Sequence, residues 1–162
     1  MIQNRQIPNV YPFPLFGDSK RNPEGVNSLE DNRGSAGFGK RVKIMVVDDE
    51  SLIAETVVEI LRDEGFDAIS VSSGASAVEL AKILRPAVVL SDVMMPGLNG
   101  IETGIKIREI VPNCKIILFS GQAATGNLLE DARRRGHSFD ILAKPIKPEH
   151  LVNIIRAGLP SQ

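Results

Sequence analysis

The sequence predicts an α/β fold in which a parallel sheet is covered by helices on both faces. Short apolar runs rich in β-branched residues, typical of strands buried on both faces, alternate with amphipathic segments of helical period. Five such strand–helix units follow one another in about 115 residues. The alternation favours three layers, because each strand–helix–strand connection crosses one face of the sheet.

Each strand is predicted from an apolar run of about five residues. The first run, Val-Lys-Ile-Met-Val-Val, is almost continuously apolar, as expected for a central strand. The others share its length and its enrichment in Val and Ile. The five expected strands are residues 42–47, 67–71, 87–91, 115–119 and 139–143.

The helices are predicted from apolar stripes and from the residues that stop or start them. Gly65 and Gly136 are typical stops, Pro86 and Pro112 end a helix before them, and Pro148 suits a first helical position. The expected helices are residues 51–64, 75–84, 100–110, 127–135 and 148–157.

Length and composition restrict the class of protein. The chain has 162 residues, 43% hydrophobic and 24% charged, with a net charge of −1, which excludes a strongly basic nucleic-acid binder. Its one cysteine, Cys114, excludes an internal disulfide framework and a multi-cysteine zinc site. No apolar run reaches the roughly 18 residues of a membrane span, and no secretory signal is seen, so we expect a cytoplasmic protein.

The first 41 residues differ from the rest. They hold four of the ten prolines, five of the fourteen glycines and four of the seven aromatic residues, with a charge of +2 against −3 for residues 42–162. We therefore expect a flexible Pro/Gly-rich N-terminal extension over residues 1–41, a folded domain over 42–159 and a tail over 160–162. A second interpretation stays open, in which residues 7–16, with three prolines, form a docking motif or an arm that packs on the domain.

Polar side chains follow four of the predicted strands. Asp48 and Asp49 follow the first strand, Asp92 the third, Ser120 the fourth and Lys144 the fifth. Because ligands of open parallel sheets bind beyond the carboxyl ends of the strands, we expect these groups at one edge.

Close carboxylates need a cation, and an all-oxygen donor set favours Mg²⁺. Asp92 is a candidate nucleophile toward phosphorus, with Lys144 to neutralise the phosphoryl charge and Ser120 to bond a phosphoryl oxygen. Other interpretations of the single residues remain open: a solvated turn at Asp48 and Asp49, a cap at Asp92, a local backbone contact at Ser120 and an ordinary surface lysine at Lys144.

Four short motifs together resemble a known family. They are Val46-Val47-Asp48-Asp49-Glu50, Ser91-Asp92-Val93-Met94-Met95-Pro96-Gly97-Leu98-Asn99-Gly100, Phe119-Ser120-Gly121 and Ala143-Lys144-Pro145. Over residues 42–159 the chain resembles the response-regulator receiver domain of bacterial two-component signal transduction, of the stand-alone type. The resemblance implies a flavodoxin-like (βα)5 fold with strand order 2-1-3-4-5.

The resemblance also implies roles for the site residues. Asp92 is the expected phosphoacceptor, with Ser120 as switch hydroxyl and Lys144 as the lysine of the site. The expected Mg²⁺ ligands, with Mn²⁺ as an alternative ion, are Asp49, Asp92, the backbone carbonyl of Met94 and, through water, Asp48. The Lys144–Pro145 bond is expected to be cis.

One position departs from the family pattern. The family usually has Tyr or Phe three residues before the lysine, where this chain has Ile141. The chain therefore lacks the aromatic side chain that the family usually couples to the switch hydroxyl, and we expect switching to rely on Ser120 and on the loop 121–126.

The resemblance implies a phosphoacceptor switch whose only chemistry is self-catalysed phosphotransfer and autodephosphorylation. The expected partners are a histidine kinase or histidine phosphotransfer protein and a downstream protein target, contacted through residues 127–135, 139–143 and 148–157. We expect a monomer or a dimer through that face, no DNA-binding domain in this chain and no membrane contact. A pseudo-receiver that only binds partners, or an aspartate-nucleophile phosphohydrolase, are the alternatives.

Overall fold

The computed structural model describes residues 40–121 and 125–159. Most of the expected N-terminal extension, the tail 160–162 and the centre of the loop 121–126 lie outside the described residues. The elements are β1 Lys43–Val47, α1 Ser51–Asp63, β2 Asp67–Val71, α2 Gly74–Leu84, β3 Val88–Asp92, α3 Gly100–Ile110, β4 Lys115–Ser120, α4 Gly126–Arg134, β5 Asp140–Ala143 and α5 Pro148–Ala157.

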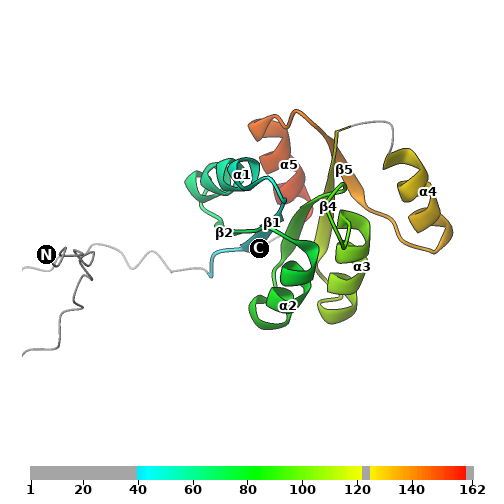
Figure 1. Cartoon of the computed structure of the whole chain (residues 1–162). Helices are drawn as coiled ribbons and strands as arrows, with labels where there is room; N and C mark the ends of the chain where they lie inside the picture. Colours follow the sequence, from blue (N-terminus) through cyan, green and yellow to red (C-terminus); the bar gives the residue numbers. More distant parts are fainter. Residues whose placement is uncertain (1–39, 122–124, 160–162) are drawn as a thin grey trace, which may run out of the picture. The chain divides into compact units, whose positions relative to one another are not determined.

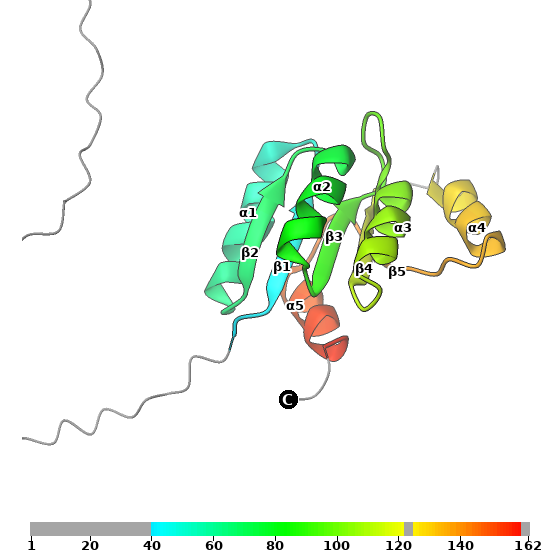
Figure 2. The ribbon, with the colours of Figure 1, turned by 90° about the horizontal axis from the view of Figure 1, so that it is seen from below.

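The five strands form one parallel sheet. Their order is β2-β1-β3-β4-β5, and every neighbouring pair is parallel. Figures 1 and 2 show this sheet with the helices packed on its two sides. The predicted doubly wound fold and strand order are therefore confirmed.

Two hydrophobic cores lie on opposite faces of the sheet. Ile44 and Val46 of β1 belong to the core beneath α1 and α5, whereas Met45 and Val47 belong to the core beneath α2 and α3. Successive side chains of a strand point to opposite faces, so an apolar run without alternation fills both cores. Ala132 joins α4 to the second core.

The ends of the elements follow local chemistry. Gly65 and Gly136 have φ of +89° and +85°, in the left-handed region that ends a helix with glycine. β3 and β4 each end one residue later than predicted, because the ladder continues where Asp92 pairs with Phe119 and Ser120 with Ala143. The acid and the hydroxyl thus lie on the last residues of rigid strands.

None of the helices in the described part of the chain combines the length and the apolar character that crossing a bilayer requires.

Candidate functional site

The sheet brings the sequence-predicted side chains to its carboxyl edge. Asp48 and Asp49 follow β1, Asp92 ends β3, Ser120 ends β4 and Lys144 follows β5. The parallel register aligns these strand ends, so residues almost 100 positions apart in the sequence gather at one place.

Three carboxylates form the centre of this edge. Asp48, Asp49 and Asp92 each place one carboxylate oxygen within 4.8 Å of the others. Asp48 and Asp92 are buried and Asp49 is exposed. The backbone N–H of Glu50 donates to Asp48 Oδ1 at 2.9 Å, which fixes the orientation of the buried carboxylate.

Lys144, which follows β5, forms ion pairs with carboxylates at the ends of β1 and β3. Its ammonium lies 3.3 Å from Asp92 Oδ1 and 3.4 Å from Asp48 Oδ2. The lysine is partly buried, and its bond to Pro145 is cis, as expected from the sequence. One cation therefore faces two buried carboxylates, which leaves the cluster with excess negative charge.

This imbalance shifts the acid–base properties of the pair. Burial raises the pKa of Asp92; the charge of Lys144 opposes this shift, and the charge of Asp48 adds to it. Burial acts to lower the pKa of Lys144, but Asp48 and Asp92 outweigh it, so that the pKa of Lys144 is raised. Lys144 is therefore held as a cation, while the charged form of Asp92 is unfavourable without a further cation.

The raised pKa of Asp92 predicts a pH-dependent stability difference. The folded state binds this proton more tightly than the unfolded chain, so the charged carboxylate destabilises the fold above its folded-state pKa. We expect Asp92→Asn to have a larger free energy of unfolding than the wild type at pH 7, in urea titrations without divalent metal. The difference should shrink as the pH falls toward the ordinary carboxylate pKa of 3.8.

The control for this experiment is Glu59→Gln, which removes an exposed carboxylate from α1. Because this carboxylate lies outside the cluster, the variant should not gain stability as Asp92→Asn does. An Asp92→Asn variant that is less stable than the wild type at pH 7 would contradict the interpretation.

The all-oxygen chemistry of the cluster fits a hard divalent cation. Carboxylate oxygens are the ligands that Mg²⁺ prefers, and Mg²⁺ usually takes few protein ligands and several waters. Asp49 is the exposed member of the cluster and gives it access to solvent. The donor set thus agrees with the ion expected from the sequence.

Thr125 is a residue of this edge that the sequence analysis did not single out. Its hydroxyl is buried and hydrogen-bonded to Ser120 Oγ at 2.5 Å. The sequence gives only a weak indication of this contact, because it shows no more than a threonine directly before the first residue of α4. The contact links the hydroxyl at the end of β4 to the start of α4.

The position that lacks the usual aromatic residue lies on β5. Ile141 is 44% exposed there. Phe139 is partly buried against the core of α2 and α3, and the guanidinium of Arg108 lies 4.7 Å from the centre of its ring. Arg108 also donates to the backbone carbonyl of Ser138 at 2.7 Å, which ties α3 to the segment before β5.

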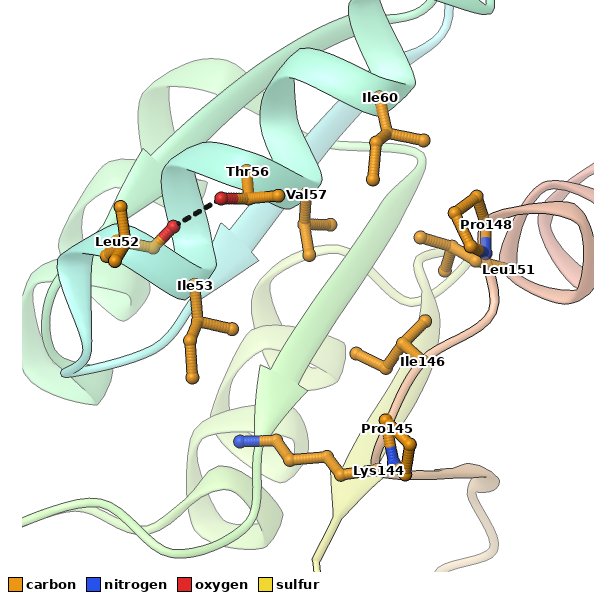
Figure 3. A pocket seen from close by; sticks show the side chains of 10 residues that line it. All are labelled: Leu52, Ile53, Thr56, Val57, Ile60, Lys144, Pro145, Ile146, Pro148 and Leu151. Carbon is orange, nitrogen blue, oxygen red and sulfur yellow. Dashed lines mark hydrogen bonds between the residues drawn. The ribbon is translucent and has the colours of Figure 1, made fainter.

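An apolar cleft adjoins the site, and the sequence analysis did not predict it. It has a volume of about 430 Å³ and lies between α1 and the segment that joins β5 to α5 (Figure 3). Leu52, Ile53 and Ile60 line one side, Ile146 lines the other, and Lys144 stands at one end. Leu52 is 78% exposed.

Comparison with known proteins agrees with this geometry. The family model described as the response regulator receiver domain matches residues 44–156. The DNA-binding response regulator MtrA of Mycolicibacterium paratuberculosis is 34% identical over 119 residues, which are 74% of this chain and 52% of MtrA. The chain thus spans about half the length of that relative. The chemotaxis protein CheY of Thermotoga maritima is 32% identical over 119 residues, covering 73% of this chain and 96% of CheY.

Solved structures give the same result. The chemotaxis protein CheY4 of Vibrio cholerae superposes with a TM-score of 0.66 at 26% identity, over 74% of this chain and 99% of CheY4. A response regulator receiver domain protein of Clostridium thermocellum also has a TM-score of 0.66, at 27% identity over 72% of this chain and 93% of that one. Since the family model covers well over half of the sequence and the fold agrees, the chain belongs to the response regulator receiver domain family of two-component systems.

Proposed function

We propose that this receiver accepts a phosphoryl group on Asp92 from a histidine kinase or a histidine phosphotransfer protein. The observation that carries the proposal is the contact of Lys144 with two of three clustered carboxylates at the carboxyl edge of the sheet. Phosphorylation of the purified chain by acetyl phosphate, compared with Asp92→Asn, tests it.

Each side chain has a role in this proposal. A carboxylate oxygen of Asp92 attacks phosphorus, the new O–P bond forms, and the bond from phosphorus to the donor nitrogen breaks. The Lys144 ammonium, 3.3 Å from Asp92 Oδ1, is placed to neutralise a phosphoryl oxygen. Autodephosphorylation by water, without turnover of other substrates, is the remaining chemistry that we propose.

A divalent ion, Mg²⁺ or alternatively Mn²⁺, would supply positive charge that offsets the phosphoryl and carboxylate charges. Asp49 and Asp92 would hold the ion directly, together with the backbone carbonyl of Met94, and Asp48 would bind through a water molecule. The buried position of Asp48 and its contact with Lys144 suit an indirect role, because its oxygens are already partnered.

We expect Mg²⁺ to stabilise the unphosphorylated protein. At a concentration ten times the Kd, binding to the folded state adds about 1.4 kcal/mol to the free energy of unfolding. Asp49→Asn should remove most of this gain in a thermal unfolding titration with Mg²⁺ against EDTA. Asp67→Asn, which removes an exposed carboxylate outside the cluster, should keep it. Equal gains in Asp49→Asn and the wild type would refute the ligand role of Asp49.

We further propose that the signal leaves through the α4–β5–α5 face. The hydrogen bond between Ser120 and Thr125 supports this route, because a phosphoryl oxygen that recruits the Ser120 hydroxyl competes with Thr125 at the start of α4. With Ile141 in place of an aromatic residue, the movement would pass through α4 itself. We propose that the α4–β5–α5 face of the domain 42–159 binds a downstream protein or a second copy of the chain in a dimer.

The apolar cleft beside Lys144 is where we propose that the phosphodonor protein rests. A protein that brings a phosphohistidine to Asp92 covers the carboxyl edge, and the exposed Leu52 offers it apolar contact. Small donors such as acetyl phosphate need no such contact.

This difference gives a test. We expect Leu52→Gln to slow phosphotransfer from a phosphorylated histidine kinase about tenfold, because losing one well-packed interface side chain costs about 1.4 kcal/mol. Phosphorylation by acetyl phosphate should stay unchanged. Ile83→Gln is the matched control, since Ile83 on α2 is equally exposed, at 80% against 78% for Leu52. Equal kinase rates in both variants would exclude the cleft as the donor contact.

A further inference from the structure

A cleft lined by basic residues lies at the opposite end of the sheet from Asp92. It has a volume of about 380 Å³, and Lys40, Arg41 and Lys43 line it together with Arg85 at the end of α2. Below we call this the basic cleft. Lys43 is the first residue of β1 and Asp48 follows the last, so the strand separates the two ends by roughly 16 Å.

The four cations of the basic cleft make no ion pair and no side-chain hydrogen bond within the described part of the chain. Other cations of the domain do, such as Lys82 with Glu79 at 2.7 Å and Lys115 with Asp140 at 3.0 Å.

Nearby negative charge is sparse. No carboxylate is among the described residues that line the basic cleft. The sheet register places one acid, the exposed Asp67, beside Lys43. Four positive charges against one leave a local excess of three.

Arg85 adds a second, independent observation. Its backbone has φ of +46°, and it is the one residue other than glycine with positive φ among the described residues. This C-terminal position after a helix favours glycine or asparagine, because a longer side chain strains the left-handed backbone there. The strained backbone places a guanidinium at the basic cleft, where its planar fork suits a phosphate group.

We propose that the basic cleft binds a small polyphosphate anion, either inorganic pyrophosphate or the diphosphate of a nucleotide. The volume of the basic cleft is in the range of small-ligand sites, and the aliphatic side chains of Ile83 and Leu84 form part of its lining. A small anion meets mainly the local excess of positive charge. A long polyanion also meets the rest of residues 42–162, which carry a charge of −5 when Lys43 and Arg85 are left out. The site leaves Asp92 free and does not depend on the proposed function.

Calorimetric titration of the full chain in low-salt buffer with EDTA tests this proposal. Without divalent metal, the carboxylate cluster repels the anions and does not compete for them. Inorganic pyrophosphate and ADP serve as separate probes. We expect saturable binding that weakens with salt and falls about tenfold in Arg85→Gly and in Arg41→Gln, with no loss in the control Lys82→Ala.

The variants separate binding from folding. Glycine relieves the positive φ at position 85, so Arg85→Gly should unfold at the same or a higher temperature than the wild type. Tighter binding of ADP than of pyrophosphate would support the nucleotide form, and equal binding would support recognition of the diphosphate alone. The proposal would be overturned if neither pyrophosphate nor ADP bound at millimolar concentration. It would also be overturned if Arg85→Gly bound these probes with the same affinity as the wild type. A loss of stability in Arg85→Gly with unchanged binding would overturn it as well, because Arg85 would then serve only the dipole of α2.

Discussion

Asp92→Asn is expected to abolish phosphorylation of this protein completely. In the wild type, incubation with acetyl phosphate and Mg²⁺ should add the mass of one phosphoryl group, measured by intact-protein mass spectrometry. The amide of asparagine lacks the anionic oxygen that attacks phosphorus, so the variant should gain none. We expect a complete loss of phosphorylation because no other carboxylate among the described residues can replace Asp92. None of them both contacts Lys144 and is the last residue of a strand at this edge.

Further variants and substrates make this experiment decisive. Asp49→Asn keeps the nucleophile and weakens the ion site, so it should be phosphorylated more slowly and to the same mass. An equal mass gain in Asp92→Asn would refute the assignment of the phosphoacceptor. No gain in the wild type, with partner binding retained, would identify a pseudo-receiver, whereas steady turnover of small phosphoesters would identify a phosphohydrolase.

Gly100→Ala is expected to have the largest effect on stability. Gly100 begins α3, and a methyl group on it would overlap the backbone carbonyl of Asp92, reaching 2.8 Å from the carbonyl carbon. Neither backbone yields easily, because the Gly100 N–H donates to Val93 O at 3.0 Å and Val93 N–H donates to Phe119 O at 3.0 Å. We expect a loss of about 3 kcal/mol in the free energy of unfolding, measured in urea.

A second glycine at the start of a helix provides the matched control. Gly126 begins α4, and nothing lies within 4 Å of an added methyl group. Gly126→Ala should therefore be neutral or stabilising by up to about 1 kcal/mol, since alanine has the higher helix propensity.

Because Gly100 touches the backbone of Asp92, Gly100→Ala should also slow phosphorylation by acetyl phosphate, and Gly126→Ala should not. A Gly100→Ala variant as stable as the wild type would contradict the close approach of α3 to β3.

The sequence by itself determined the fold and which polar side chains gather at the carboxyl edge of the sheet. The short and mostly apolar runs, as in Lys43–Val47, carry side chains for both faces of a sheet, and glycine or proline marks the end or start of most helices. Because all strands are parallel, the residues at their carboxyl ends must reach the same edge, which is why the meeting of Asp49, Asp92 and Lys144 was predictable.

The tertiary structure alone decided which groups touch. The Thr125 hydroxyl against Ser120, the single lysine shared by two buried carboxylates and the apolar cleft beside α1 depend on distances between elements. The basic cleft likewise joins the start of β1 to the end of α2, residues about forty positions apart. Local periodicity fixes what each segment is and which face it buries, whereas the spacing between packed segments sets contacts, burial and pKa shifts. Contacts, burial and pKa shifts arise only when the helices pack on the sheet.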